Sequence, residues 1–190
     1  MKLRLFLLAG AVALATTMSA SAEPSDREVS VGRAQTLQIS VTGDVVAVPD
    51  PLLKVVRAHA TSGGRPTPLQ CDVVRTGRVL ELTITGPGRS VLPFAAASGG
   101  YAVEVRYPPA LHLRVREFSG TVSVPNPQSA VEIYDAAGAI SVEGARGSVT
   151  AQADRGDIAV TGAHSTIELT TGTGDIDALL APGWRGNRVR

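Results

Sequence analysis

Nine-residue units follow one another without a break from residue 120: GTVSVPNPQ (120–128), SAVEIYDAA (129–137), GAISVEGAR (138–146), GSVTAQADR (147–155), GDIAVTGAH (156–164), STIELTTGT (165–173) and GDIDA (174–178). Every unit begins with Gly or Ser, and the residues two and four positions later are apolar. A strict period of this kind is typical of solenoids, in which stacked repeats bury their apolar faces against one another. The stretch therefore predicts a β-solenoid with one strand and one corner in each unit.

Each unit is expected to place two side chains in a thin core. Because side chains i and i+2 of a strand point to the same face, Ile158 and Val160 should lie inside and Ala159 outside. Two units, or eighteen residues, then make one flattened coil with two faces. Glycine suits the corners because it allows a positive φ or a close approach to the next coil. The expected corner glycines are Gly120, Gly138, Gly147, Gly156 and Gly174.

The N-terminal half alternates between apolar and polar positions in several short runs, of which residues 37–41 and 79–84 are the clearest. Residues 76–78 (TGR) read as a hairpin turn between strands at 69–75 and 79–84. The predicted fold class is all-β: an N-terminal antiparallel β-sheet running into a short two-faced β-solenoid. We expect the sheet in residues 23–110, the solenoid repeats in 111–180, and a C-terminal cap or tail containing Trp184 in 181–190.

The first 22 residues have the pattern of a secretory signal peptide. Lys2 and Arg4 precede a short apolar run, and Ala20 and Ala22 supply the small residues of a cleavage site. The apolar run is too short to span a bilayer, and no later stretch of the mature chain is long enough to anchor it. We therefore expect an exported protein, located in the periplasm or at the cell surface.

Composition narrows the function further. Residues 117–180 carry nine acidic side chains and two basic ones, and such an acidic surface argues against nucleic-acid binding. The single cysteine, Cys71, cannot form an internal disulfide and is expected to pack as a small core residue.

A family resemblance rests on YAVEVRYPPALHLRV (101–115), GTVSV (120–124), GDIAVTG (156–162) and GDIDAL (174–179). These stretches resemble the bacterial putative-adhesin family of secreted β-strand-repeat proteins, a domain of unknown function. The resemblance covers residues 101–180 and, more loosely, 36–86. It implies a β-solenoid in the cell envelope and no known catalytic residues.

The aspartates expected at the corners suggest Ca²⁺ as the metal to consider. Asp157 and Asp175 are eighteen residues apart and should stack on one corner, with Asp177 nearby. Carboxylates in adjacent coils can bind Ca²⁺. However, the calcium-binding nonapeptide needs an acid where this chain has Ile176. The dipeptide Gly-Asp is also common at turns that bind no metal. We therefore predict no metal or cofactor site, with these three aspartates as weak candidates.

Catalytic patterns are weak. No G-x-S-x-G elbow is present, and the three histidines, His59, His112 and His164, show no spacing typical of a triad. A polysaccharide-active enzyme with two carboxylates in a cleft remains an alternative of a different class.

The polar residues between the inward pairs should form two flat faces. Glu132, Thr150 and Glu168 would share one face, and Ser123, Ser141, Ala159 and Asp177 the other. Such faces can bind a protein or a glycan, or can be the solvated side of a solenoid. The function predicted from the sequence is a non-enzymatic envelope or surface protein, adhesin-like in binding or scaffolding. The alternative is a periplasmic structural or envelope-stress-associated protein that self-associates through its solenoid ends.

Overall fold

The computed structural model describes residues 25–85, 101–117, 119–182 and 188–189, and these form strands and connecting turns without any helix. The expected signal peptide and Trp184 lie outside the described residues. The strands are β1 (Asp26–Ser30), β2 (Thr36–Val41), β3 (Asp44–Pro49), β4 (Val55–Ser62), β5 (Arg65–Pro66), β6 (Gln70–Thr76), β7 (Val79–Thr85), β8 (Tyr101–Tyr107), β9 (His112–Glu117), β10 (Val122–Pro125), β11 (Val131–Asp135), β12 (Ile140–Glu143), β13 (Val149–Arg155), β14 (Ile158–Ala163), β15 (Ile167–Thr173), β16 (Ile176–Leu180) and β17 (Arg188–Val189).

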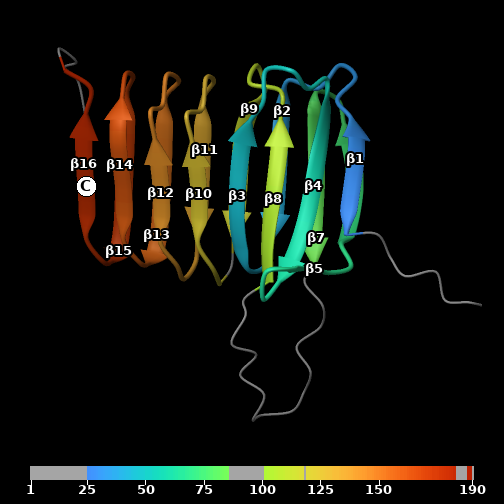
Figure 1. Ribbon diagram of the computed structural model, residues 1–190. Coiled ribbons are helices and arrows are strands. Elements are labelled where there is room, and N and C mark those ends of the chain that lie inside the picture. The colour runs from blue at the N-terminus through green and yellow to red at the C-terminus, as the bar shows by residue number, and fades with distance from the viewer. Residues whose placement is uncertain (1–24, 86–100, 118, 183–187, 190) are drawn as a thin grey trace, which may run out of the picture.

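The strands build two layered sheets (Figure 1). Sheet A has the order β1-β4-β8-β3-β10-β12-β14-β16, with β5 beside β4, and sheet B has the order β17-β15-β13-β11-β9-β2-β7-β6. From β9 to β16 consecutive strands alternate between the two sheets. The all-β expectation is therefore confirmed for the described residues. No segment among them is a helix long and apolar enough to cross a membrane.

The C-terminal strands pair in parallel, with partners eighteen residues apart. In sheet A, Val122 pairs with Ile140 and Ile140 with Ile158. In sheet B, Val131 pairs with Val149 and Val149 with Ile167. These partners all face the space between the sheets and are at most 1% exposed. Each aliphatic side chain thus stacks on the equivalent side chain of the neighbouring strand, where burial contributes roughly 1.5–3 kcal/mol.

The expectation of an antiparallel N-terminal sheet is wrong for the strands that adjoin the repeats. β2 pairs in parallel with both β7 and β9, and β3 pairs in parallel with both β8 and β10. Antiparallel pairing is found farther out, between β1 and β4, β4 and β8, β4 and β5, and β6 and β7. Both sheets are therefore mixed. The hairpin expected around residues 76–78 is the β6–β7 pair.

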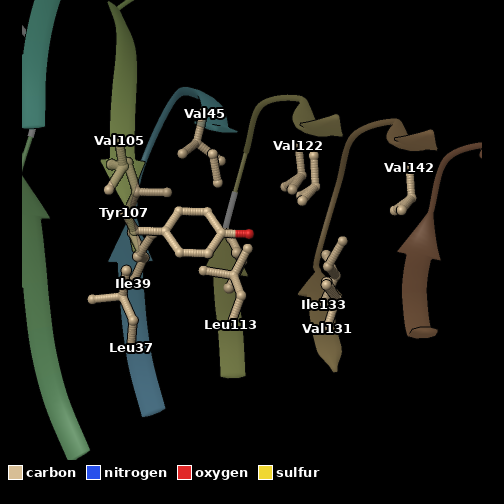
Figure 2. Packing of buried hydrophobic residues seen from close by; sticks show 14 of the residues in the cluster. Leu37, Ile39, Val45, Val105, Tyr107, Leu113, Val122, Val131, Ile133 and Val142 are labelled. Atoms are coloured by element: carbon tan, nitrogen blue, oxygen red, sulfur yellow. The ribbon is translucent and has the colours of Figure 1, made fainter. Parts of the chain in front are cut away.

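One continuous core joins the N-terminal and C-terminal strands. Its members include Val56 on β4 and Leu80 on β7 near one end and Ile158 on β14 and Leu169 on β15 toward the other. Figure 2 shows the ring of Tyr107, the largest fully buried side chain, lying among the aliphatic side chains at the centre of this core. Burial raises the pKa of the Tyr107 phenol well above its ordinary value, so the group stays neutral.

Coverage of the core falls off at β16. The sequence places Ile176 and Ala178 inward, but Ile176 is only half-buried and Ala178 is exposed. β16 is the last strand of sheet A, and among the described residues only β14 pairs with it. An inward side chain in the middle of a sheet is covered by neighbouring strands on both sides, whereas β16 has a described neighbour on one side, so its inward side chains gain about half of the usual contacts.

Candidate functional site

The corner glycines lie where two backbones almost touch. A Cβ added to Gly138 would fall 1.4 Å from the carbonyl oxygen of Gly120, and one added to Gly156 would fall 1.7 Å from that of Gly138. Gly174 and Gly147 meet the backbones of Gly156 and Ser129 in the same way, at 2.2 Å each. No side chain fits at these distances. The five predicted corner residues thus form two columns, with Gly120, Gly138, Gly156 and Gly174 in one and Gly147 in the other.

One member of the corner column is missing from the sequence prediction. A Cβ on Gly120 would fall 2.4 Å from the carbonyl carbon of Gly43, so Gly43 continues the column into the N-terminal strands. The sequence does contain a hint of this corner, because Gly43-Asp44 is the same dipeptide that begins two of the repeats. It lies 77 residues before Gly120, outside any regular period, and only the pairing of β3 with β10 brings the two together.

The aspartates at the corners accept hydrogen bonds from the chain. Asp157 Oδ1 accepts from the backbone N–H of Asp175 at 2.8 Å. Asp44 Oδ1 accepts from both the backbone N–H and the hydroxyl of Thr121 at 2.9 Å. Asp177 lies on β16 opposite Ala159 and is exposed. In the described parts of the chain, no three His, Cys, Asp or Glu side chains form a group that could hold a metal ion.

The outer faces of the repeats carry rows of polar side chains. On sheet A, Ser123 pairs with Ser141, Ser141 with Ala159, and Ala159 with Asp177. On sheet B, Glu132 pairs with Thr150, and Thr150 with Glu168. Both rows hold the residues expected from the sequence. The sheet B row continues to Arg114, whose guanidinium forms an ion pair with Glu132 at 2.9 Å.

A charged hollow of about 630 Å³ lies on the outer face of sheet A, over β1, β4 and β8. Its lining residues are Asp26, Arg27, Glu28, Arg57, Ala58, His59, Glu104 and Arg106. Most of these charges come from outward positions of three strands that are far apart in the sequence. We call this surface the charged hollow.

The charges in the hollow are arranged in two rows. In the first row Glu28 is opposite Arg57, and Arg57 is opposite Arg106. In the second row Asp26 is opposite His59, and His59 is opposite Glu104. These positions were not predicted to form a site, because nothing local in the sequence shows which strands will be neighbours. The only signal was the alternation of charge in Asp26-x-Glu28, Arg57-x-His59 and Glu104-x-Arg106.

Contacts between oppositely charged side chains hold these residues in place and leave charges of both signs exposed. Arg57 Nε lies 2.9 Å from Glu28, and Arg106 Nε lies 2.5 Å from Glu104. His59 Nδ1 lies 2.8 Å from Asp26, and this hydrogen bond lowers the pKa of the Asp26 carboxyl. All six side chains keep 39% or more of their surface exposed, so solvent screens each pair and its contribution to stability is small. They remain free to exchange partners with a ligand.

A second group of ionisable residues is buried between the sheets. Glu117 ends β9 and Asp135 ends β11, and the two are partners in the parallel ladder. Both are completely buried. Each continues the inward alternation of its strand, after Val115 and Ile133 respectively, so the strand geometry turns a carboxyl group into the core. The sequence analysis did not single out this pair.

Each buried carboxyl has one satisfied and one unsatisfied oxygen. Glu117 Oε1 accepts from the backbone N–H groups of Gly43 at 3.0 Å and Ser119 at 2.7 Å. Asp135 Oδ1 accepts from the backbone N–H of Ala137 at 2.9 Å. Glu117 Oε2 and Asp135 Oδ2 have no hydrogen-bond donor. Burial, helped by the charges of Glu117 and Asp154, raises the pKa of Asp135 to about 7, although the Ala137 hydrogen bond lowers it.

This pair has no access for a substrate. Glycoside hydrolysis needs two carboxyl groups that flank a bound sugar, and neither Glu117 nor Asp135 has any exposed surface. The histidines do not join them: His112 and His164 are exposed, and His59 lies in the charged hollow. The accessible charged surface and the buried carboxyl pair are therefore separate features of the molecule.

Comparison with known proteins gives a likeness in fold. No protein-family model matches the chain, and no curated protein matches it. A solved structure described as a putative cell adhesion protein from Clostridium sporogenes ATCC 15579 is similar, with a TM-score of 0.53 and 8% sequence identity. The alignment covers 83% of this chain and 100% of that one. At this identity the likeness concerns the fold alone.

Proposed function

We propose that this protein is a non-enzymatic, exported binding module of the cell envelope, built as a short two-faced β-solenoid. The observation that carries the proposal is the charged hollow, where acidic and basic side chains from three strands gather on one exposed face. A surface with both signs of charge suits a polar protein or glycan partner, because such a ligand can exchange hydrogen bonds with each ion pair. The fold of the described cell adhesion protein is consistent with this role.

The partner would be recognised by the two arginines that face each other. Arg57 and Arg106 are directly opposite on β4 and β8, and like charges in that position repel. A carboxylate or sulfate on the partner would relieve this repulsion by lying between the two guanidinium groups. The flanking Glu28 and Glu104 would then accept from hydroxyl or amino groups beside it.

Binding through the hollow is tested by removing the two arginines. The Arg57→Ala/Arg106→Ala variant should lose at least tenfold in affinity for envelope polysaccharide or surface protein fractions of the source cells, measured by biolayer interferometry. Arg114→Ala is the matched control, since it removes an arginine from an ion pair on the outer face of sheet B. Equal binding by all three proteins would contradict a role for the hollow.

The cellular location is tested independently. Protease digestion of the tagged protein on intact source cells would place the repeats outside, as adhesion requires. Protection until the cells are permeabilised would favour a periplasmic scaffold and would contradict the adhesin reading.

Self-association is a second candidate function, favoured by the exposed last strand. Leu179 on β16 is 65% exposed, and in the described chain β16 has one hydrogen-bonded neighbour. An edge strand of this kind can pair with another chain. Light scattering should then give a mass above that of the monomer for the native protein and the monomer mass for Leu179→Lys. Equal masses would contradict pairing through β16.

A further inference from the structure

The buried carboxyl pair lies at the joint between the N-terminal strands and the repeats. Glu117 Oε1 holds the N–H of Gly43, in the β2–β3 turn, and the N–H of Ser119, in the turn after β9. Asp135 Oδ1 holds the N–H of Ala137, in the turn after β11. Glu117 therefore links two neighbouring corners, and Asp135 holds the turn of the next corner along the same edge.

The ladder neighbours of the pair carry no charge. Its neighbours in the ladder are Val41 on β2 and Ala153 on β13, which are both apolar and buried. The charge on β13 that acts on Asp135 is that of Asp154, an exposed acid whose Oδ2 accepts from the Tyr134 hydroxyl at 2.8 Å. Among the described residues, no Lys, Arg or His is paired with either carboxyl.

Two ionised carboxylates are therefore poorly accommodated in this place. Each would carry a buried oxygen without a donor, next to a second negative charge on the adjacent strand. Leaving a charged group buried and unpaired is strongly unfavourable. One proton placed between Glu117 Oε2 and Asp135 Oδ2 satisfies both oxygens and leaves a single negative charge, as in other carboxyl pairs that share a site.

We propose that Glu117 and Asp135 share one proton, and that its loss loosens the three corners at which their side chains accept hydrogen bonds. When the pair carries the proton, its hydrogen bonds keep the N-terminal strands and the repeats in place relative to each other. The doubly ionised pair repels itself and draws in water, which competes for the N–H groups of Gly43, Ser119 and Ala137. This makes the joint a pH-sensitive device, separate from the charged hollow and independent of the proposed binding function.

The sign of the effect on stability follows from proton linkage. Asp135 has a pKa of about 7 in the folded protein, against about 3.9 in an unfolded chain. Between these values the folded state holds one proton more than the unfolded state. The equilibrium constant for unfolding should therefore rise by up to about tenfold for each pH unit between pH 4 and pH 7 from this group alone.

The first experiment compares urea unfolding of the wild type and Asp135→Asn across this pH range. Asparagine keeps the acceptor for Ala137 and can donate its N–H to Glu117, but it does not titrate. The ratio of the two unfolding constants should change by more than tenfold between pH 4.5 and pH 7. Asp157→Asn, at an exposed corner, should run parallel to the wild type. Parallel curves for wild type and Asp135→Asn would overturn the proposal.

A second measurement does not depend on a variant that folds. The side-chain carboxyl ¹³C signal of Asp135 in the wild-type protein should titrate with a midpoint above about 5.5, well beyond the usual range for aspartate. A midpoint at or below that value would overturn the shared proton. In Glu117→Gln the midpoint should fall below it, because the glutamine amide donates to the ionised Asp135.

Hydrogen exchange locates the loosening. Protection factors of the Gly43, Ser119 and Ala137 amides should fall by at least tenfold from pH 5 to pH 8 in the wild type. The amide of Asn126, which donates to the Glu143 carbonyl between the neighbouring strands β10 and β12, should keep its protection factor. A uniform fall in the protection factors of all four amides, or no fall in any of them, would contradict a loosening confined to these three corners.

Discussion

At Gly138 the backbone of one repeat passes directly over the backbone of the repeat before it. The close approach, and not the φ angle, excludes a side chain there, since Gly138 is not among the residues with positive φ. At the other corner Ser129 and Ser165 each carry a Cβ, whereas Gly147 meets the Ser129 backbone at 2.2 Å, so the close approach differs from unit to unit. Glycine at a corner thus marks a place where the backbones of adjacent turns approach too closely for a side chain.

Gly138→Ala should destabilise the protein by about 3 kcal/mol or more, because the new Cβ would lie 1.4 Å from the Gly120 oxygen and the backbone must shift. Urea unfolding measures the loss. Ser165→Ala is the control: it begins a unit at the other corner, where a Cβ already fits, and should change stability by less than about 1 kcal/mol. Equal losses would show that the contact is not what makes glycine necessary.

Asp157 acts as a corner acceptor in this structure. Asp157→Ala should lose about 1 kcal/mol of stability, since the N–H of Asp175 loses its partner at an exposed site. Asp157→Asn, which keeps the acceptor oxygen, should behave like the wild type. Calcium chloride at millimolar concentration should leave all three melting temperatures unchanged in differential scanning calorimetry. A calcium-dependent rise in the wild type, absent from Asp157→Asn, would assign a metal site to this corner.

At the scale of the element, each strand of the repeats contributes at least two inward side chains, and the aliphatic ones hold the sheets together. Ile158→Asp should unfold the protein or destabilise it by more than about 4 kcal/mol, because Ile158 is 1% exposed and stacks on Ile140 and Ile176. Ser141→Asp, on the outer face of sheet A, should cost less than about 1 kcal/mol. The readouts are circular dichroism and thermal melting; an unchanged melting temperature for Ile158→Asp would contradict the assigned inward face.

At the scale of the whole molecule, a deletion tests whether eighteen residues form one interchangeable layer. Deleting residues 138–155 joins Ala137 to Gly156 and places Ile158 beside Val122, in the register that Ile140 now occupies. The shortened protein should stay folded, with a lower melting temperature from the lost interface. Deleting only 138–146 sends every later strand to the opposite sheet and should prevent cooperative folding. Similar melting curves for the two deletions would contradict the layer.

The inward faces of the strands could be predicted from the sequence, and the reason is local. Alternation places Val122 and Val124 on one side of their strand whatever the strand pairs with, and a period of eighteen predicts Ile140 as the partner of Val122. The corner residues and the polar rows follow from the same period. For this part of the chain, nearest neighbours in space are those with equivalent places in the repeat.

Tertiary structure alone decided the N-terminal pairing and the two groups of charged residues. Leu37 and Leu113 are partners across 76 residues, and no repeat period in the sequence predicts that they pair. The charged hollow depends on β1 and β8 flanking β4, and the buried carboxyl pair depends on β9 lying beside β11 with its last residue turned inward. The sequence by itself determined the strands, their inward faces and the stacking period, because these depend on residues close in the chain. The strand partners outside the repeat, and with them both charged groups, were decided by the packing of the whole core, because long-range pairing is selected by total burial and not by any local pattern.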